Sequence, residues 1–344
     1  MKIEGQVRIP SGCAIAAVIS KDGNKMSGEM ITNSMKPMHD RSNGLGGGFA
    51  AYGIYPEYKD FYAFHMFFDS RSTRKECEAF LKERFEIVQS EIIPTRKIPA
   101  ITDEPIIWRY FVSPLKSMLV SMQLDEKEFV ARTVMKINTE MSGAYVFSSG
   151  KNMGTFKAVG FPEDVGVFYK LEEYEGYSWT AHGRYPTNTL GWWGGAHPFT
   201  LLDYSIVHNG EISSYDANRR FIEMFGYKCT LHSRKILGCY FYTLPVVYES
   251  LQSLPWLYAQ SPLAYVYNKK MVERERNSSL PSCATYYPCA SILSERLSFQ
   301  IVFSCIPLHD YYYFCIIGIF TSKSLFLNSP IVLSICIQST YPWT

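Results

Sequence analysis

The segment from Trp179 to Tyr215 gathers residue types that could carry out chemistry. It holds three histidines, one arginine (Arg184), several glycines and two asparagines between short apolar runs. A segment that only filled a core would show steady alternation or a helical period instead. Polar residues placed at turns between strands are how a rigid scaffold presents binding and catalytic groups. The segment therefore predicts a functional site.

Within this segment, Leu202–Val207 predicts a short buried strand that ends at His208-Asn209-Gly210. Asn-Gly is a strong signal for a hairpin turn, because both residues tolerate positive φ. The same pair could also form an oxyanion hole, in which the Asn209 side-chain amide and the Gly210 backbone N–H donate hydrogen bonds. Asn-Gly alone leaves both interpretations open.

Three short motifs in this region carry a resemblance to a known family. They are His182-Gly-Arg-Tyr-Pro-Thr-Asn188, Ala196-His-Pro-Phe199 and His208-Asn-Gly-Glu-Ile212. In this order they resemble the class II glutamine amidotransferases, and their wording is closest to the stand-alone amidotransferase domain of glutamate synthases. The resemblance covers about residues 13–232. It implies a four-layer αββα N-terminal-nucleophile hydrolase sandwich, an α+β fold, with a cysteine as the first residue of the mature chain.

Cys13 opens the apolar run Cys13–Ile19, which predicts a buried strand. A cysteine in such a run can simply be a small core residue. The resemblance implies instead that Met1–Gly12 is a leader and that Cys13 becomes the nucleophile when the leader is removed. A thiol with a pKa near 8.5 needs a base, and a free α-amino group with a pKa near 8 can serve. An uncleaved Gly12–Cys13 amide could not act as that base.

The remaining site residues are assigned by their chemistry and by the resemblance. Arg184 offers a planar charged fork that suits the α-carboxylate of glutamine, although a structural salt bridge is the alternative. Thr187 would add a hydroxyl contact to the same end of the substrate. His197 either lines the pocket or fixes a turn with the proline that follows it. His182 and His208 are expected to orient loops.

Other chemistry finds little support in the same segment. The histidines are 15 and 11 residues apart with no i, i+4 pair, which is weak for a metal site. Trp192-Trp193-Gly194-Gly195 predicts a mobile pocket lid rather than a platform for stacking bases, because no basic cluster accompanies it. We predict no metal and no cofactor in this chain.

Composition sets broad limits on localisation and partners. The 344 residues carry a net charge of +2, so nothing in the charge favours nucleic acid. The first twelve residues lack the apolar run of a signal peptide, and the nine cysteines show no C-x-x-C spacing. A reduced, cytoplasmic protein is therefore expected.

The rest of the first 232 residues predicts elements that would position the site. The glycine-rich stretch Asn43–Gly48 lacks the context of a phosphate-binding loop, so we expect close backbone packing at a turn. Prolines 94, 99, 105 and 114 predict loops. Strands are expected at 49–54, 60–68, 146–149 and 155–159. One helix is expected to begin at Ile31, and three more are expected at Ser72–Ser90, Asp125–Thr139 and Asp164–Tyr169.

The resemblance ends at Ser233-Arg234-Lys235. There the family pattern calls for an aspartate that holds the substrate's α-amino group, and this chain has none. From 277 to 344 only four of 68 residues are charged, against 19% overall, with no clear period. A reading-frame shift near Ser233 is our first interpretation; an unfamiliar β-rich domain or a membrane segment are the alternatives. The expected organisation is leader 1–12, amidotransferase domain 13–235 and atypical tail 236–344.

Two functions follow from these observations. The first is a glutaminase that passes ammonia to a glutamate-synthase-type partner subunit, which by the resemblance would carry flavin and iron–sulfur clusters. The second is a non-catalytic or damaged relative with an incomplete glutamine pocket, favoured by the missing aspartate. A peptidase with an N-terminal nucleophile is less favoured, because the Arg184 and Asn209 motifs match those of glutamine users.

Overall fold

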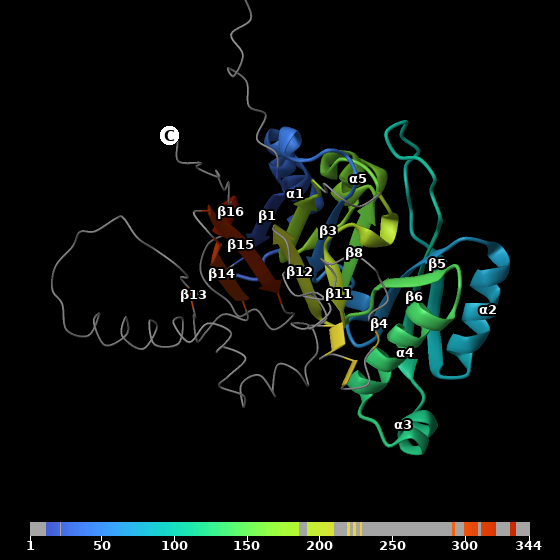
Figure 1. The fold of residues 1–344 in the computed structure, drawn as a ribbon. Helices are drawn as coiled ribbons and strands as arrows, with labels where there is room; N and C mark the ends of the chain where they lie inside the picture. Colours follow the sequence, from blue (N-terminus) through green and yellow to red (C-terminus); the bar gives the residue numbers. More distant parts are fainter. Residues whose placement is uncertain are drawn as a thin grey trace, which may run out of the picture.

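The computed structural model describes residues 12–20, 22–185 and 191–209, with 219–220, 223–224 and 228. It also gives the backbone of four strands between residues 291 and 334, and at residues 208–209 it likewise gives only the backbone. Figure 1 shows the arrangement of the elements. Of the predicted site residues, Thr187 and Gly210 lie outside the described residues, as do residues 1–11 of the predicted leader and Ser233–Lys235.

The sheet that carries the predicted nucleophile is antiparallel, with strand order β16-β1-β10-β3-β8. The pairing places Ala14 opposite Gly183 and His182 opposite Gly48. Directly opposite residues share a face of the sheet, so these registers fix which side chains meet. The strands are β1 (Ala14–Ile19), β3 (Gly47–Tyr52), β8 (Met153–Ala158), β10 (Ser178–Gly183) and β16 (Ile331–Ser334).

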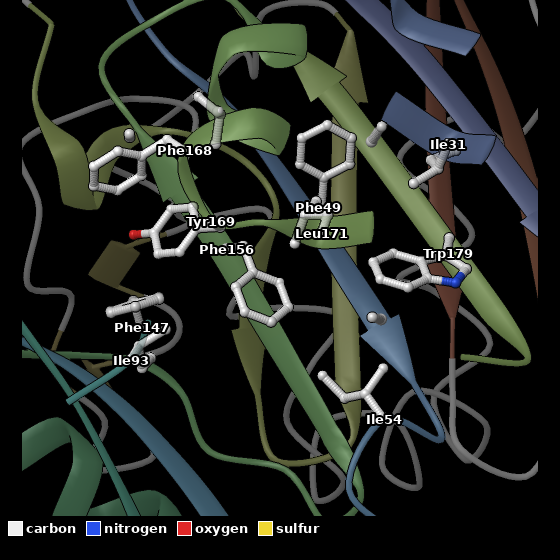
Figure 2. Close-up of a cluster of buried hydrophobic side chains, with 14 of the residues drawn as sticks. Ile31, Phe49, Ile54, Ile93, Phe147, Phe156, Phe168, Tyr169, Leu171 and Trp179 are labelled. Carbon is white, nitrogen blue, oxygen red and sulfur yellow. The ribbon is translucent and has the colours of Figure 1, made fainter. Parts of the chain in front are cut away.

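Two helices cover one face of this sheet, α1 (Gly28–Met35) and α5 (Pro162–Phe168). Ser27 caps α1 by accepting a hydrogen bond from the Glu29 N–H, which satisfies a donor that the first turn leaves unpaired. Ile31 and Trp179 are among the fully buried side chains of the resulting core, shown in Figure 2. Burial of such large apolar groups is the main force that holds the helices to the sheet.

A second sheet, in the order β5-β6-β4-β7, packs between the first sheet and three further helices. Strand β4 is buried on both faces: Ala63 and Phe67 belong to the core with the first sheet, whereas Phe64 and Phe68 pack with the helices. The elements are β4 (Tyr62–Phe68), β5 (Phe85–Ile92), β6 (Ile106–Pro114), β7 (Ala144–Ser148), α2 (Arg71–Lys82), α3 (Lys116–Met122) and α4 (Glu126–Glu140).

Strands β11 (Phe199–Leu201) and β12 (Tyr204–Asn209) form a hairpin beside β7, where the Thr200 hydroxyl donates to the Phe147 carbonyl at 2.6 Å. Strand β12 also pairs with β15, in the order β11-β12-β15-β14-β13. The remaining elements are β2 (Met26–Ser27), β9 (Glu175–Gly176), β13 (Ser291–Ile292), β14 (Phe299–Leu308), β15 (Tyr311–Phe320), and the 3-10 turns η1 (Lys36–Arg41), η2 (Pro56–Tyr58), η3 (Leu171–Glu173) and η4 (Trp193–Gly195).

The layers are therefore helix, sheet, sheet, helix, and the predicted α+β, four-layer αββα sandwich is confirmed. Strand β4 packs against the first sheet on one face and against helices on the other, which explains its near-continuous apolar run. In the part of the chain that the structure describes, no helix is both long and apolar enough to cross a membrane.

Three local predictions were wrong. The predicted helix Ser72–Ser90 ends at Lys82, and β5 begins at Phe85, where pairing with β6 selects the strand. The predicted strand Leu202–Val207 begins too early: Leu202, at φ +51°, and Asp203 form the turn between β11 and β12, and β12 starts at Tyr204. Strand β12 runs on to Asn209 instead of ending at Val207. Pro114 closes strand β6 rather than lying in a loop.

A buried chain of hydrogen bonds links the two sheets. The Arg109 guanidinium donates to the Tyr55 hydroxyl at 2.9 Å, and that oxygen lies 2.9 Å from His65 Nε2. His65 Nδ1 lies 2.8 Å from the Thr155 carbonyl of β8, and Glu91 pairs with Arg109. Burial, together with the charge of Arg109, lowers the pKa of His65 to about 3 from its ordinary value near 6.5.

Stability should therefore fall with acid because of His65. The unfolded chain binds a proton there below pH 6.5, whereas the folded chain resists protonation down to about pH 3. The stabilisation is complete above pH 6.5 and is lost as the pH falls from 6.5 toward 3. Between pH 7 and 5 the loss amounts to about 2 kcal/mol. Urea unfolding of wild type and His65→Gln over this range would measure it; equal pH slopes in both proteins would contradict the assignment.

Candidate active site

Cys13 lies immediately before β1 and is 6% exposed. The pairing of Ala14 with Gly183 brings the next pair, Cys13 and Arg184, to the same end of β1 and β10. The Tyr185 backbone N–H donates to Cys13 Sγ at 3.4 Å. The hydrogen bond holds the sulfur of Cys13 against the backbone at the junction of β1 and β10.

Arg184 is held by the glycine-rich turn that precedes β3. Its backbone N–H donates to the Gly46 carbonyl at 2.8 Å, and its carbonyl accepts from the Ser42 hydroxyl at 2.9 Å. Its Nη1 lies 3.5 Å from the Leu45 carbonyl. The side chain is 3% exposed, so the guanidinium is fixed before any ligand arrives. A fixed planar fork loses little conformational entropy when it binds a carboxylate.

The expectation of close backbone packing in this turn is confirmed. A Cβ at Gly46 would lie 2.9 Å from Arg184 Cδ, and the φ of Gly46 is +149°, which side chains rarely adopt. A Cβ at Gly47 would lie 2.8 Å from the backbone of Pro162. Glycine is therefore needed here so that Arg184 and helix α5 can approach the chain.

Replacing Gly48 with alanine should damage the site and the fold together. The added methyl would collide with the backbone carbonyl of His197 and lie 2.7 Å from that of Phe156. Overpacking against two backbone segments should lower the free energy of unfolding by about 3 kcal/mol. Gly195→Ala is the matched control, because its nearest contacts, at 3.4 and 3.5 Å, are ordinary. Equal melting temperatures for both variants would contradict the prediction.

His182 and His197 stack on each other with ring centroids 4.2 Å apart, and both are fully buried. The His197 ring also meets Phe199 edge-on at 4.5 Å. The structure thus places His197 in the turn that leads into β11, next to β10. Whether its ring also contacts substrate stays a prediction. His182 lies on β10 and packs against the ring of His197; its expected orienting role stays a prediction.

The tryptophan pair has two different roles. Trp192 is 43% exposed and meets Tyr145 at 5.1 Å, whereas Trp193 is buried between Phe67 and Phe168. The prediction of a lid formed by both is therefore wrong for Trp193, which belongs to the core cluster. Its burial anchors the turn η4 at the start of the loop that carries His197.

The predicted oxyanion residues can be placed only in part. Asn209 is the last residue of β12, and Val207, two residues before it, packs against Ile15 and Ala17 of β1. The Tyr52 hydroxyl donates to Ser205 Oγ at 2.8 Å and ties the same strand to the first sheet. Strand β12 therefore crosses the sheet that carries Cys13, but the donor role of Asn209 and Gly210 stays a prediction.

Arg41 is a site neighbour that sequence reasoning did not find. It closes η1, and its Nη2 would lie 3.2 Å from a Cβ at Gly12, whose φ is +149°. A permanent cation thus borders the Gly12–Cys13 peptide. No sequence signal marks it, because Arg41 stands in an ordinary polar stretch and reaches Gly12 only through the fold.

The other described cysteine behaves as a core residue. Cys77 is fully buried in α2, and burial raises the pKa of its thiol to about 12. A thiol with so high a pKa is inert at neutral pH. Neither Cys13 nor Cys77 forms a disulfide. Among the residues that the structure describes, no cluster of three His, Cys, Asp or Glu side chains could hold a metal ion.

Comparison with known proteins identifies the family of this chain. Residues 49–250, more than half of the chain, match the sequence model of the family described as glutamine amidotransferases class-II. A protein of Archaeoglobus fulgidus, described as "Uncharacterized protein", is 54% identical over 222 residues. That match covers 64% of this chain and 58% of the relative, so it spans less than two thirds of the relative's length. The chain belongs to the class II glutamine amidotransferases.

Proposed function

We propose that this chain hydrolyses L-glutamine to L-glutamate and ammonia, with Cys13 as the nucleophile. The observation that carries the proposal is the junction of β1 and β10, where Cys13 Sγ accepts from the Tyr185 N–H beside the buried Arg184. A thiol and a fixed guanidinium side by side suit a substrate that has both an amide and a carboxylate. Membership of the family supports glutamine as that substrate.

The reaction proceeds in two steps. The α-amino group of Cys13 takes the thiol proton, and the thiolate attacks the side-chain amide carbon of glutamine. Asn209 and Gly210 donate hydrogen bonds to the oxyanion that forms. The C–N bond then breaks, the amino group of Cys13 returns the proton, and ammonia leaves a γ-glutamyl thioester. Water attacks the thioester, the C–S bond breaks, and glutamate and the free thiol result.

Substrate recognition falls to Arg184, Thr187 and His197. Arg184 pairs with the α-carboxylate through its fork, Thr187 adds a hydroxyl contact, and His197 borders the pocket. The rigid setting of Arg184 in the glycine-rich turn supports the first of these roles. A fixed clamp at one end of glutamine brings the amide at the other end to the thiol, which is how orientation accelerates a reaction.

Two further parts of the proposal concern processing and partners. Residues 1–12 must be removed, because an amide nitrogen at Cys13 cannot accept a proton. The ammonia passes to a synthase subunit of the glutamate synthase type, which would carry flavin and iron–sulfur clusters. The motif wording from His182 to Ile212 supports that partner class.

Two forms of the protein test the hydrolysis: one whose first residue is Cys13 and one that retains Met1. We expect glutamate and ammonia in equal amounts from the first and none from the second. A diazoketone analogue of glutamine should add its mass to the Cys13 peptide and leave the Cys77 peptide unchanged, because Cys77 is buried with a raised pKa. Equal activity of both proteins would refute the role of the amino group; no activity in either would refute the function.

A second candidate is a glutamine-binding or damaged relative without catalysis. The observation in its favour is that Ser233-Arg234-Lys235 holds no acidic residue for the substrate's ammonium group. Calorimetric binding of glutamine without ammonia release, in protein shown by intact mass to begin at Cys13, would favour this candidate. Turnover of the same sample would exclude it.

A further inference from the structure

Lys157 is a lysine buried in the middle of the molecule, 1% exposed, on strand β8. Its Nζ donates to the backbone carbonyls of Gly194 at 3.0 Å, Ala196 at 3.2 Å and Pro198 at 3.4 Å. An ammonium group has three N–H donors and no acceptor, so these carbonyls match its capacity. The Lys157 side chain thus binds the carbonyl of every second residue in the loop 194–198.

The environment of the ammonium is suited to a cation. Its Nζ lies 4.8 Å from the centre of the Phe199 ring, and the rings of Tyr145 and Phe147 lie at 5.8 and 5.9 Å. Aromatic faces and carbonyl oxygens both present negative potential to a buried charge. Burying a charge is costly unless hydrogen bonds and aromatic rings stabilise it in this way. The surroundings of Lys157 therefore favour a charged lysine at this position.

The loop that Lys157 holds lies over the row of residues next to the nucleophile. Lys157 is opposite Gly48 on β3, and Gly48 is opposite His182 on β10. The His197 carbonyl approaches Gly48, and the His197 ring stacks on His182. Arg184 comes two residues after His182, just past the end of β10.

The same loop forms a wall for Arg184. A Cβ at Gly46 would lie 2.9 Å from Arg184 Cδ and 3.2 Å from the Ala196 side chain, so both crowd the same point. Gly195, of the same loop, also lies close to the guanidinium, because a Cβ there would be 3.5 Å from Arg184 Nη1. A shift of the loop would therefore move the surroundings of the guanidinium that the proposed function assigns to the glutamine carboxylate.

We propose that Lys157 is a positioning residue for the glutamine site: it fixes the 194–198 loop, and through it Arg184 and His197. The inference rests on the proposed function, because its readout is the recognition of glutamine. In this proposal Lys157 contacts neither the Cys13 thiol nor the reacting atoms of glutamine. Its loss should therefore weaken substrate binding and leave the intrinsic reactivity of Cys13 intact.

Lys157→Met tests this, because methionine fills similar space and donates no hydrogen bond. We expect KM for glutamine to rise at least about tenfold, since a loop displaced by an ångström can cost far more than that. Glutamine should also protect Cys13 from iodoacetamide less well. The alkylation rate without glutamine should stay within about twofold of wild type, because the thiol keeps its surroundings. Lys151→Met is the control. Lys151 lies on the turn before β8 and forms an ion pair with Glu126, and its loss should leave KM unchanged.

Lys157→Gln gives the second test, and decides the matter if the methionine variant does not fold. Its amide keeps two N–H donors and loses the charge, so we expect an intermediate KM and a native circular dichroism spectrum. An unchanged KM in a folded Lys157 variant of an active enzyme would overturn the inference alone. Equal loss of alkylation rate and of substrate binding would do so too, because it would indicate a general structural role. An inactive wild type would instead refute the proposed function.

Discussion

Replacing Cys13 with alanine is expected to abolish glutamine hydrolysis, with kcat reduced at least about a thousandfold. Without the sulfur there is no thioester, and the remaining groups can only orient glutamine toward water. The fold should survive, because the change removes one buried sulfur and leaves the strand pairing of β1 intact. The free energy of unfolding should fall by about 1 kcal/mol. Coupled release of glutamate and ammonia measures the loss.

The variant should still bind glutamine, because Arg184 and its glycine-rich turn are unchanged. Isothermal titration of Cys13→Ala with glutamine would therefore separate binding from chemistry. Cys77→Ala is the matched control: it removes the other described thiol, which is buried in α2 and takes no part in the proposed reaction. Residual turnover above a tenth of wild type in Cys13→Ala would exclude Cys13 as the nucleophile.

Replacing Arg184 with methionine is expected to lower kcat/KM for glutamine by about a hundredfold to a thousandfold, mainly through KM. Truncating one partner of a buried charge pair typically costs 2–5 kcal/mol, and each 1.4 kcal/mol is about tenfold. Arg184→Lys should recover little, because a lysine keeps the charge but cannot present a planar fork. Steady-state kinetics of the three proteins would measure these effects.

A substrate analogue makes this prediction specific to the carboxylate. 4-Aminobutanamide has the amide of glutamine and lacks its α-carboxylate, so wild type should strongly prefer glutamine. Arg184→Met should lose most of that preference, which a cycle of two enzymes and two substrates would report. Arg96→Met, which breaks an exposed ion pair with Glu172, is the control and should keep the preference. An undiminished preference in Arg184→Met would assign the carboxylate to another residue.

Local sequence identified much of this site. The apolar run after Cys13 predicted a buried strand, and the structure has β1 at Ala14–Ile19. The motifs at 182–188 and 196–199 marked Arg184 and His197, and both lie within the same part of the fold. These features are readable because a strand's period, a charged fork and a glycine's missing Cβ are each properties of a few adjacent residues.

Other features depended on elements far apart in the chain. Cys13 meets the Tyr185 N–H, Arg41 reaches Gly12, and Lys157 gathers the carbonyls of the 194–198 loop only because the sheet brings β1, β10, β3 and β8 together. Helix α2 and strand β5 were merged for a related reason. A charged stretch suits either element, and only packing on β6 selects the strand.

The sequence by itself determined the family, the α+β class, and the residue types able to attack an amide and hold a carboxylate. The tertiary structure decided which of them are fixed and by what: the backbone of the glycine-rich turn holds Arg184, and a buried lysine holds the loop beside it. The physical reason is that a buried charge takes its partners from whatever the register of the sheet places within reach, and register is a property of the whole fold.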